Sequence, residues 1–190
     1  MQLAHISDLH VKAPLGPWTG LLNKRWIGAV TLLRRAHPDE ILDGCIDDLA
    51  KAPPDHLAVT GDLTNLVLES ELEKAAAAIA RAGLPPERLT VIPGNHDAYI
   101  GGPHRARRFE HHIGPLLGEP ALEWPRAQRH GDVLLVSVSS AVPTPWFTAF
   151  GRVGAEQLGK ARALLTQDAA FKVLLVHHPP VQRTGKLDWV

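Results

Sequence analysis

The sequence has little cysteine, no net charge and no long apolar run, and each absence excludes a class of protein. A single cysteine among 190 residues, Cys45, excludes an intrachain disulfide and the cysteine-rich zinc modules. Twenty basic residues balance twenty acidic ones, so no net field attracts polyanions, and nucleic acid is disfavoured as a partner. Neither a basic leader nor the ~18-residue apolar run of a transmembrane helix occurs. These features predict a cytoplasmic protein.

The distribution of apolar residues predicts a single α/β domain over residues 1–190. Hydrophobic residues make up 45% of the chain, which is enough for a sizeable core. Short apolar runs predict buried strands, and amphipathic patterns between them predict helices. The expected strands cover residues 3–6, 56–60, 89–93, 133–138 and 171–176, and the expected helices cover residues 21–36, 40–52, 71–82 and 153–165. This alternation favours a largely parallel sheet covered by helices.

Local signals refine the expected helices and one loop. Cys45 lies on the apolar face of the helix over 40–52, so it is expected in the core and not as a metal ligand. Ser70 followed by Glu73 is a start signal for the next helix, and Gly83 is an end signal. Residues 139–152 show no periodicity and are predicted to form a loop over one face.

Polar motifs follow four of the five expected strands, at the point where each apolar run ends. In open α/β sheets, ligands bind beyond the carboxyl ends of the strands, so these loops are expected to meet in one crevice. Gly61 and Gly94 suit such tight turns, which can need positive φ and close backbone approach that a Cβ atom would obstruct. The motifs are Ser7-Asp8-Leu9-His10, Gly61-Asp62-Leu63-Thr64-Asn65, Gly94-Asn95-His96-Asp97 and His177-His178-Pro179-Pro180.

The residue types in these loops point to hydrolysis assisted by metal ions. Carboxylates, imidazoles and an amide oxygen form a ligand set that suits Mn, Fe or Zn. Two ions about 3.5–4 Å apart need a bridging carboxylate with separate flanking ligands, and Asp62 is the natural bridge. A water between the ions becomes a bridging hydroxide that can attack phosphorus, while the ions neutralise the phosphoryl oxygens.

The ordered series Asp-x-His, Gly-Asp, Gly-Asn-His-Asp and His-His-Pro-Pro resembles that of the calcineurin-like metallophosphoesterase superfamily. It extends from Asp8 to Pro180. The resemblance implies a β-sandwich core of mixed sheets flanked by helices, and a small-molecule phosphate ester as substrate. It also implies two metal ions: Asp8 and His10 hold the first, Asn95 and His177 hold the second, and Asp62 bridges the two ions. His96 is then expected to contact the substrate phosphate, with Asp97 as its partner. His177 is preferred over His178 as the ligand because it directly follows the strand, which leaves His178 as a candidate substrate-binding residue.

The motifs also separate branches of the superfamily. Phosphoprotein phosphatases carry an Asp-Arg pair shortly after Gly-Asp, whereas here Leu63-Thr64-Asn65 follows. Lipid A precursor hydrolases usually replace the motif histidine with arginine, whereas this chain has His96. The remaining pattern is similar to that of the cyclic nucleotide and glycerophosphodiester phosphodiesterases. Phosphodiesters are therefore the first expected substrate class, and a phosphomonoesterase or lipid-linked pyrophosphatase of the same fold is the alternative.

One motif of the superfamily is missing. In the superfamily, a late Gly-His-x-His sequence normally completes the coordination of both metal ions. None of the sixteen glycines here is followed by histidine. We therefore expect a C-terminally incomplete domain that lacks its last strands and has an apolar sheet edge prone to association, including homo-oligomers. A catalytically weak binding or scaffold protein is the competing hypothesis from another functional class.

Several other residues have both a structural and a functional interpretation. His5 is expected to be a packed, hydrogen-bonded neighbour of the site. Arg105, Arg107 and Arg108 are more simply a solvated helix face than a phosphate clamp. Two further segments have alternatives to packing on the core: residues 18–35 are basic and could contact a membrane peripherally, and Trp146, Phe147 and Phe150 could stack on a nucleobase.

Overall fold

The computed structural model describes residues 1–13, 38–99, 101–105, 107–145 and 148–181. Its strands are β1 (Leu3–Ile6), β2 (His56–Thr60), β3 (Leu89–Ile92), β4 (Arg126–His130), β5 (Val133–Ser137) and β6 (Phe171–Leu175). Its helices are α2 (Asp39–Lys51), α3 (Glu69–Ala80), α4 (Asn95–Ala98), α5 (Gly101–Arg105), α6 (Arg108–Ile113) and α7 (Ala155–Leu165), with 3-10 turns η1 (Pro86–Arg88) and η2 (Gly114–Leu117). The expected helix over 21–36, the basic segment 18–35, and Trp146 and Phe147 lie outside the described residues.

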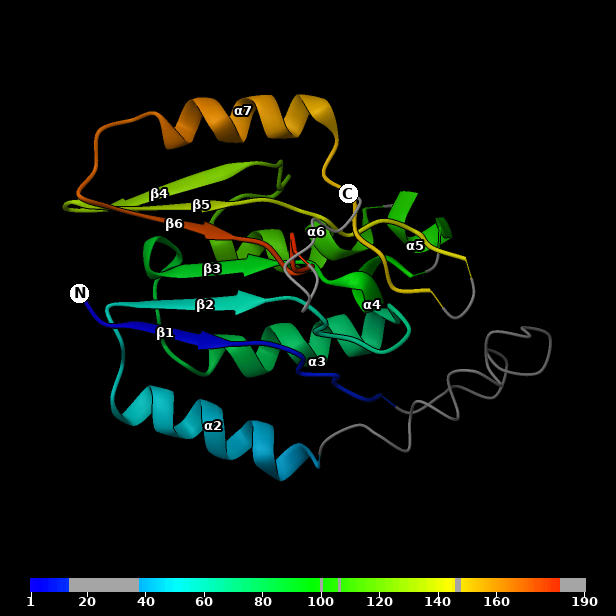
Figure 1. Cartoon of the computed structure of the whole chain (residues 1–190). Coiled ribbons are helices and arrows are strands. Elements are labelled where there is room, and N and C mark those ends of the chain that lie inside the picture. Colours follow the sequence, from blue (N-terminus) through cyan, green and yellow to red (C-terminus); the bar gives the residue numbers. More distant parts are fainter. Residues whose placement is uncertain (14–37, 100, 106, 146–147, 182–190) are drawn as a thin grey trace.

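The strands form two three-stranded sheets that face each other between layers of helices (Figure 1). The first sheet has the order β1-β2-β3 and is parallel throughout. The second has the order β4-β5-β6, with β4 antiparallel and β6 parallel to β5. Helix α7 covers the outer face of the second sheet, and α2 and α3 lie on the far side of the first. The expected fold, mixed sheets flanked by helices, is therefore confirmed.

All five strands expected from apolar runs are present, but two of them are less buried than expected. Strands β2 and β3 are buried at every residue because the second sheet packs on one face of them and helices pack on the other, even though β3 is also an edge strand. Strand β1 is the edge of its sheet, and its residues alternate between exposed and half-buried. Strand β6 has a neighbour on one side only among the described residues, and Phe171 and Leu174 are exposed. Within the described residues β6 therefore forms an apolar edge, as expected, whereas the Val133 run is paired on both sides, by β4 and by β6.

Strand β4 was not expected from the sequence. Its residues, Arg-Ala-Gln-Arg-His, contain no apolar run, and they alternate between half-buried and exposed. The strand forms because Gly131 and Asp132 make a two-residue turn that pairs His130 with Val133. Gly131 has a φ of 56°, as such hairpin turns require. The Gly-Asp pair before the apolar β5 run is the sequence feature from which this hairpin could have been predicted.

The helices correct two local expectations. On α2, Ile46 is buried and Leu42 and Leu49 are half-buried, whereas Ile41 and Cys45 are exposed. The buried stripe is therefore narrower than the apolar pattern suggested, and the prediction that Cys45 is a core residue is wrong.

Helix α3 begins at Glu69, and its N-terminus is held by Glu71, not by the Ser70 and Glu73 pair. The Glu71 carboxylate accepts hydrogen bonds from the backbone N–H groups of Leu66 (2.9 Å) and Leu68 (3.1 Å). Burial, which outweighs these bonds, raises the pKa of Glu71. The end signal at Gly83 is confirmed, since its φ is 69° and the helix ends at Ala80.

The main core lies between the first sheet and the helices beside it. Leu72 and Ile79 of α3, Val59 of β2 and Ile113 of α6 are almost fully buried in it. Each such side chain contributes about 1.5–3 kcal/mol by leaving water. A smaller cluster between the sheets joins Ala58, Ile92 and Leu175, and it holds the two layers together. Within the ranges given above, no helix combines the length and the apolar character needed to cross a membrane.

Candidate metal centre

The loop after β1 is positioned by the loop after β2. The Asp8 N–H donates to the Gly61 carbonyl (3.0 Å), and the His10 N–H donates to the Asp62 carbonyl (2.9 Å). The Asn65 side chain clamps the same loop, because its Nδ2 donates to the His10 carbonyl at 2.9 Å. Parallel pairing thus continues beyond the strands and brings the first two motifs side by side.

The glycines at the strand ends are required by close packing of the loops. At Gly61, φ is 96°, and a Cβ atom would lie 2.6 Å from both Gly94 N and His177 Nδ1. At Gly94, φ is negative, but a Cβ atom would overlap the backbone and side chain of Asp62. The prediction is confirmed for Gly61, which has both positive φ and close approach; for Gly94 close approach is confirmed, but the expectation of positive φ is wrong.

The backbone at the site is strained. Asp8, His10 and Asp62 have φ values of 59°, 45° and 53°, in the left-handed region that non-glycine residues rarely adopt. Such conformations cost about 1–3 kcal/mol each and persist where the surrounding structure imposes them, often at functional sites. Three of them lie within two neighbouring loops here. This arrangement brings the His10 and Asp62 side chains into one cluster, whereas the Asp8 side chain is 55% exposed and approaches His10 from outside that cluster.

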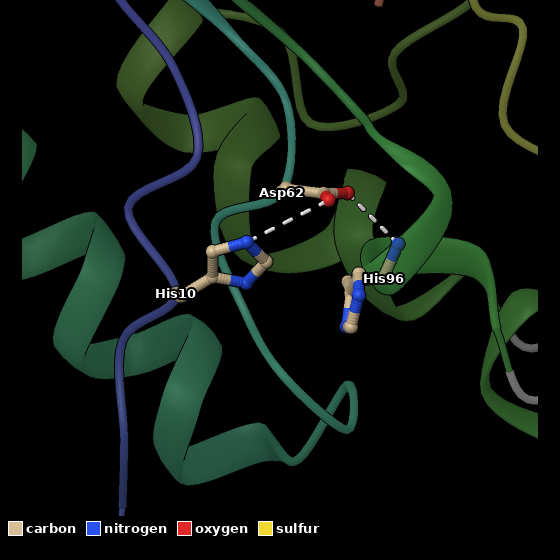
Figure 2. A group of neighbouring side chains, drawn as sticks. All are labelled: His10, Asp62 and His96. Atoms are coloured by element: carbon tan, nitrogen blue, oxygen red, sulfur yellow. Dashed lines mark hydrogen bonds and ion pairs between the residues drawn. The ribbon is translucent and has the colours of Figure 1, made fainter. Parts of the chain in front are cut away.

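His10, Asp62 and His96 come together in a cluster whose potential ligand atoms all lie within 4.8 Å of one another (Figure 2). The His10 Nε2 atom lies 3.9 Å from Asp62 Oδ2 and 3.9 Å from Asp8 Oδ1. Burial, followed by the neighbouring His96 ring, lowers the pKa of His10. The His10 ring therefore stays neutral near pH 7 and keeps a lone pair for a cation.

His177 and Asn95 lie on the other side of the Asp62 carboxylate. The His177 Nδ1 atom is 2.7 Å from the Thr60 carbonyl oxygen, which can only accept, so Nδ1 carries the proton. The bare Nε2 atom lies 3.1 Å from Asn95 Oδ1 and 3.5 Å from Asp62 Oδ1. The lone pairs of His177 Nε2 and Asn95 Oδ1 thus face each other beside Asp62 Oδ1, which accepts a hydrogen bond from the His96 backbone N–H.

His96 is oriented by Asn65 and not by Asp97. The His96 Nδ1 atom lies 3.1 Å from the Asn65 carbonyl oxygen, and the His96 backbone N–H donates to Asp62 Oδ1 at 2.9 Å. The fully buried Asp97 carboxylate instead accepts hydrogen bonds from the backbone of Leu63, Thr64 and Gly94.

The expected role of Asp97 as the partner of His96 is therefore corrected. Asp97 ties the second motif loop to the third. Burial and the nearby Asp62 carboxylate raise the pKa of Asp97 to about 6.

His178 turns to a different neighbour from His177. Its Nδ1 atom lies 2.7 Å from Ser140 Oγ, and a Cβ atom at Gly151 would overlap its ring. The two histidine rings meet edge to face at 5.0 Å. Of the two, His177 is the one that lies beside Asp62 and Asn95.

Two residues that orient the cluster carried no predicted role. Thr60 sets the tautomer of His177 through its carbonyl, and its hydroxyl lies 2.7 Å from Nε2 of His5, as expected for a hydrogen-bonded neighbour of the site. Asn65 orients both His10 and His96. Asn65 belongs to the Gly-Asp-Leu-Thr-Asn motif, so its place beside Asp62 was a usable signal, whereas backbone carbonyls leave no trace in a sequence.

The side-chain nitrogen and oxygen atoms of this cluster suit the coordination of metal ions. Gaps of 3.5–3.9 Å separate Asp62 from His10 and His177, which is too long for hydrogen bonds. A cation that lies about 2.0–2.2 Å from each ligand atom would bridge such gaps. These observations define the class of the site, a candidate metal centre.

Comparison with known families agrees with this class. The model of the calcineurin-like phosphoesterase family matches residues 1–189. The chain therefore belongs to the calcineurin-like phosphoesterases. None of the curated proteins compared with the chain matches it.

The Gly61→Ala substitution is expected to lower the free energy of unfolding by about 2–5 kcal/mol, because positive φ and overpacking both oppose a methyl group there. Chemical unfolding followed by circular dichroism measures the loss. Gly44→Ala is the matched control, since Gly44 lies within α2 with nothing near its Cβ position, and a gain of about 0.5–1 kcal/mol is expected. Equal stability of Gly61→Ala and the parent chain would contradict the close packing of the strand-end loops.

Proposed function

We propose that the chain hydrolyses phosphodiesters at a centre of two metal ions bridged by Asp62. The observation that carries this proposal is the position of the Asp62 carboxylate between two groups of potential metal ligands. Its Oδ2 atom faces His10 Nε2 at 3.9 Å, and its Oδ1 atom faces His177 Nε2 at 3.5 Å. A carboxylate with a different imidazole on each oxygen suits a bridge better than a ligand of a single ion.

The remaining donors divide into two sets around this bridge. Asp8 and His10 would hold the first ion, and their side chains approach to 3.9 Å. Asn95 and His177 would hold the second ion, and their donor atoms lie 3.1 Å apart. When bound, Mn, Fe or Zn ions supply an activated water and neutralise the phosphoryl oxygens.

His96 would contact the substrate phosphate. Its Nδ1–H bond points to the Asn65 carbonyl, which leaves Nε2 for a ligand or a proton. The ring lies edge to face against His10 at 4.8 Å, so it is next to the donors of the first ion. Once Nε2 is protonated, it can donate a hydrogen bond to a phosphoryl oxygen or give its proton to the leaving group.

The substrate would be a small molecule, and diesters are the first expectation because the Gly-Asp-Leu-Thr and His-His-Pro-Pro motifs resemble those of phosphodiesterases. In the test, hydrolysis of bis(p-nitrophenyl) phosphate and of p-nitrophenyl phosphate is measured with and without added Mn²⁺. We expect Mn²⁺-dependent turnover of both compounds, with the diester hydrolysed faster.

The two compounds also separate the alternatives. Faster hydrolysis of the monoester would assign the site to a phosphomonoesterase. A chain that is folded by circular dichroism and inert toward both compounds at saturating Mn²⁺ would refute the proposed hydrolysis. The same sample dialysed against a chelator is the control, because its rate should fall to background and return on addition of Mn²⁺.

A further inference from the structure

A second pair of histidines lies at the opposite end of the strands from the candidate metal centre. His56 begins β2 in the first sheet, and His130 ends β4 in the second. Their ring centroids are 4.7 Å apart, with an angle of 67° between the planes. At about 3.3 Å per residue along a strand, His56 is roughly 20 Å from Asp62. The pair is therefore separate from the candidate metal centre.

A chain of hydrogen bonds sets the tautomer of His56. Gln128 Nε2 donates to the carbonyls of Leu89 (3.1 Å) and Pro86 (3.3 Å), so Gln128 presents its oxygen to Thr90. The Thr90 hydroxyl donates its only proton to that oxygen. His56 Nε2, which is 2.9 Å from Thr90 Oγ1, must then be the donor in this contact. The Nδ1 atom of His56 consequently has a bare lone pair.

This lone pair is buried and has no hydrogen-bond donor. His56 is 0% exposed, and its Nδ1 atom has no partner. The Glu87 backbone also lies beside the His56 ring, where it raises the pKa of His56 by less than burial and His130 lower it. The Nε2 atom of His130 is likewise buried without a partner. Burial, and then the neighbouring His130, lowers the pKa of His56 to about 4, so protonation does not supply the missing donor near pH 7.

We propose that His56 and His130 form a second metal site, for an ion such as Zn²⁺, which links the two sheets. Imidazole nitrogens suit Zn²⁺, and a histidine that binds metal usually donates its other ring N–H to a fixed acceptor, as His56 does to Thr90. The Glu87 carbonyl and water would complete the coordination. An open pocket of about 820 Å³ is lined in part by Glu87, Gln128 and His130, so it reaches His130, although the buried His56 does not line it.

Zinc stoichiometry tests the site. The number of Zn²⁺ ions per chain and their affinities are measured by equilibrium dialysis for the parent chain and for His130→Gln. We expect the variant to bind one ion fewer, or that ion about tenfold or more weakly. His112→Gln is the matched control, because this half-buried histidine of α6 lies outside both clusters. Identical zinc binding by a folded His130→Gln variant and the parent chain would overturn the proposal.

A measurement on the parent chain does not depend on how the variant folds. Long-range ¹H–¹⁵N NMR reports the ring nitrogens of each histidine. Addition of Zn²⁺ is expected to shift the Nδ1 signal of His56 and the Nε2 signal of His130, while the His56 Nε2–H remains protonated. Unchanged signals of both rings at saturating Zn²⁺ would overturn the proposal and assign the two lone pairs to a buried water.

Discussion

Replacement of Asp62 by asparagine is expected to lower metal-dependent hydrolysis by about 10²–10³-fold while the fold is retained. The amide has nearly the same shape, so it fits the space of a side chain that is 6% exposed. It removes the negative charge, however, and places an N–H₂ group beside one of the two facing imidazoles. The binding of both ions should weaken together. Initial rates with added Mn²⁺, and the Mn²⁺ content per chain, provide the measurement.

Asp48→Asn is the matched control for this substitution. Asp48 lies on α2, its side chain is 83% exposed, and its contact with Lys51 at 3.6 Å is a surface pair of little energetic weight. Parent-like rate and metal content are expected there. If Asp62→Asn also kept both quantities at the parent level, Asp62 would not be the bridge, and a single-ion site would have to be considered.

His96→Ala is expected to lower the hydrolysis rate by about 10²–10⁴-fold without changing the number of bound ions. In the proposed function, His96 acts on the phosphate, so its removal leaves Asp8, His10, Asp62, Asn95 and His177 in place. The exposed His111 of α6 supplies the control His111→Ala, which should match the parent chain. Turnover and metal content are measured on the same samples.

The metal content decides between two roles for His96. The cluster of His10, Asp62 and His96 is compact enough for all three to hold one ion. If His96→Ala lost both activity and metal, His96 would be a ligand, and its assignment to the substrate would be wrong. Asn95→Ala is a useful companion, because Asn95 is assigned to the second ion and its removal should lower both quantities.

The location of the site follows from the sequence because parallel strands impose polarity. The motifs after β1, β2 and β3 all begin at the carboxyl ends of parallel strands in the first sheet. The positions of Asp8, Asp62 and Asn95 in the sequence therefore predicted that these residues lie at the same end of that sheet. His177 arrives from β6 of the other sheet, and its position beside Asp62 rests on the packing of the two sheets. The sequence supported only its place directly after a strand.

The errors arise where the deciding interaction is made by the backbone or by a distant segment. Asp97 was assigned to His96 by resemblance to the superfamily, yet its carboxylate accepts hydrogen bonds from N–H groups about thirty residues away. Strand β4 has almost no apolar residues and forms because a tight turn pairs it with β5. Cys45 lies among the apolar residues of α2, but only a narrow stripe of this helix is buried, and Cys45 lies outside that stripe.

By itself, the sequence determined the α/β class, the strands of the two sheets other than β4, and the four loops that carry polar ligands. These depend on periodicity and on residue type, which are local properties. Only the tertiary structure decided that Asp62 lies between His10 and His177, that Asn65 orients His96, and that His56 has a buried lone pair facing no donor. Each of these depends on which atoms meet across loops and sheets, because the direction of a hydrogen bond is set by its partners and not by the residue alone.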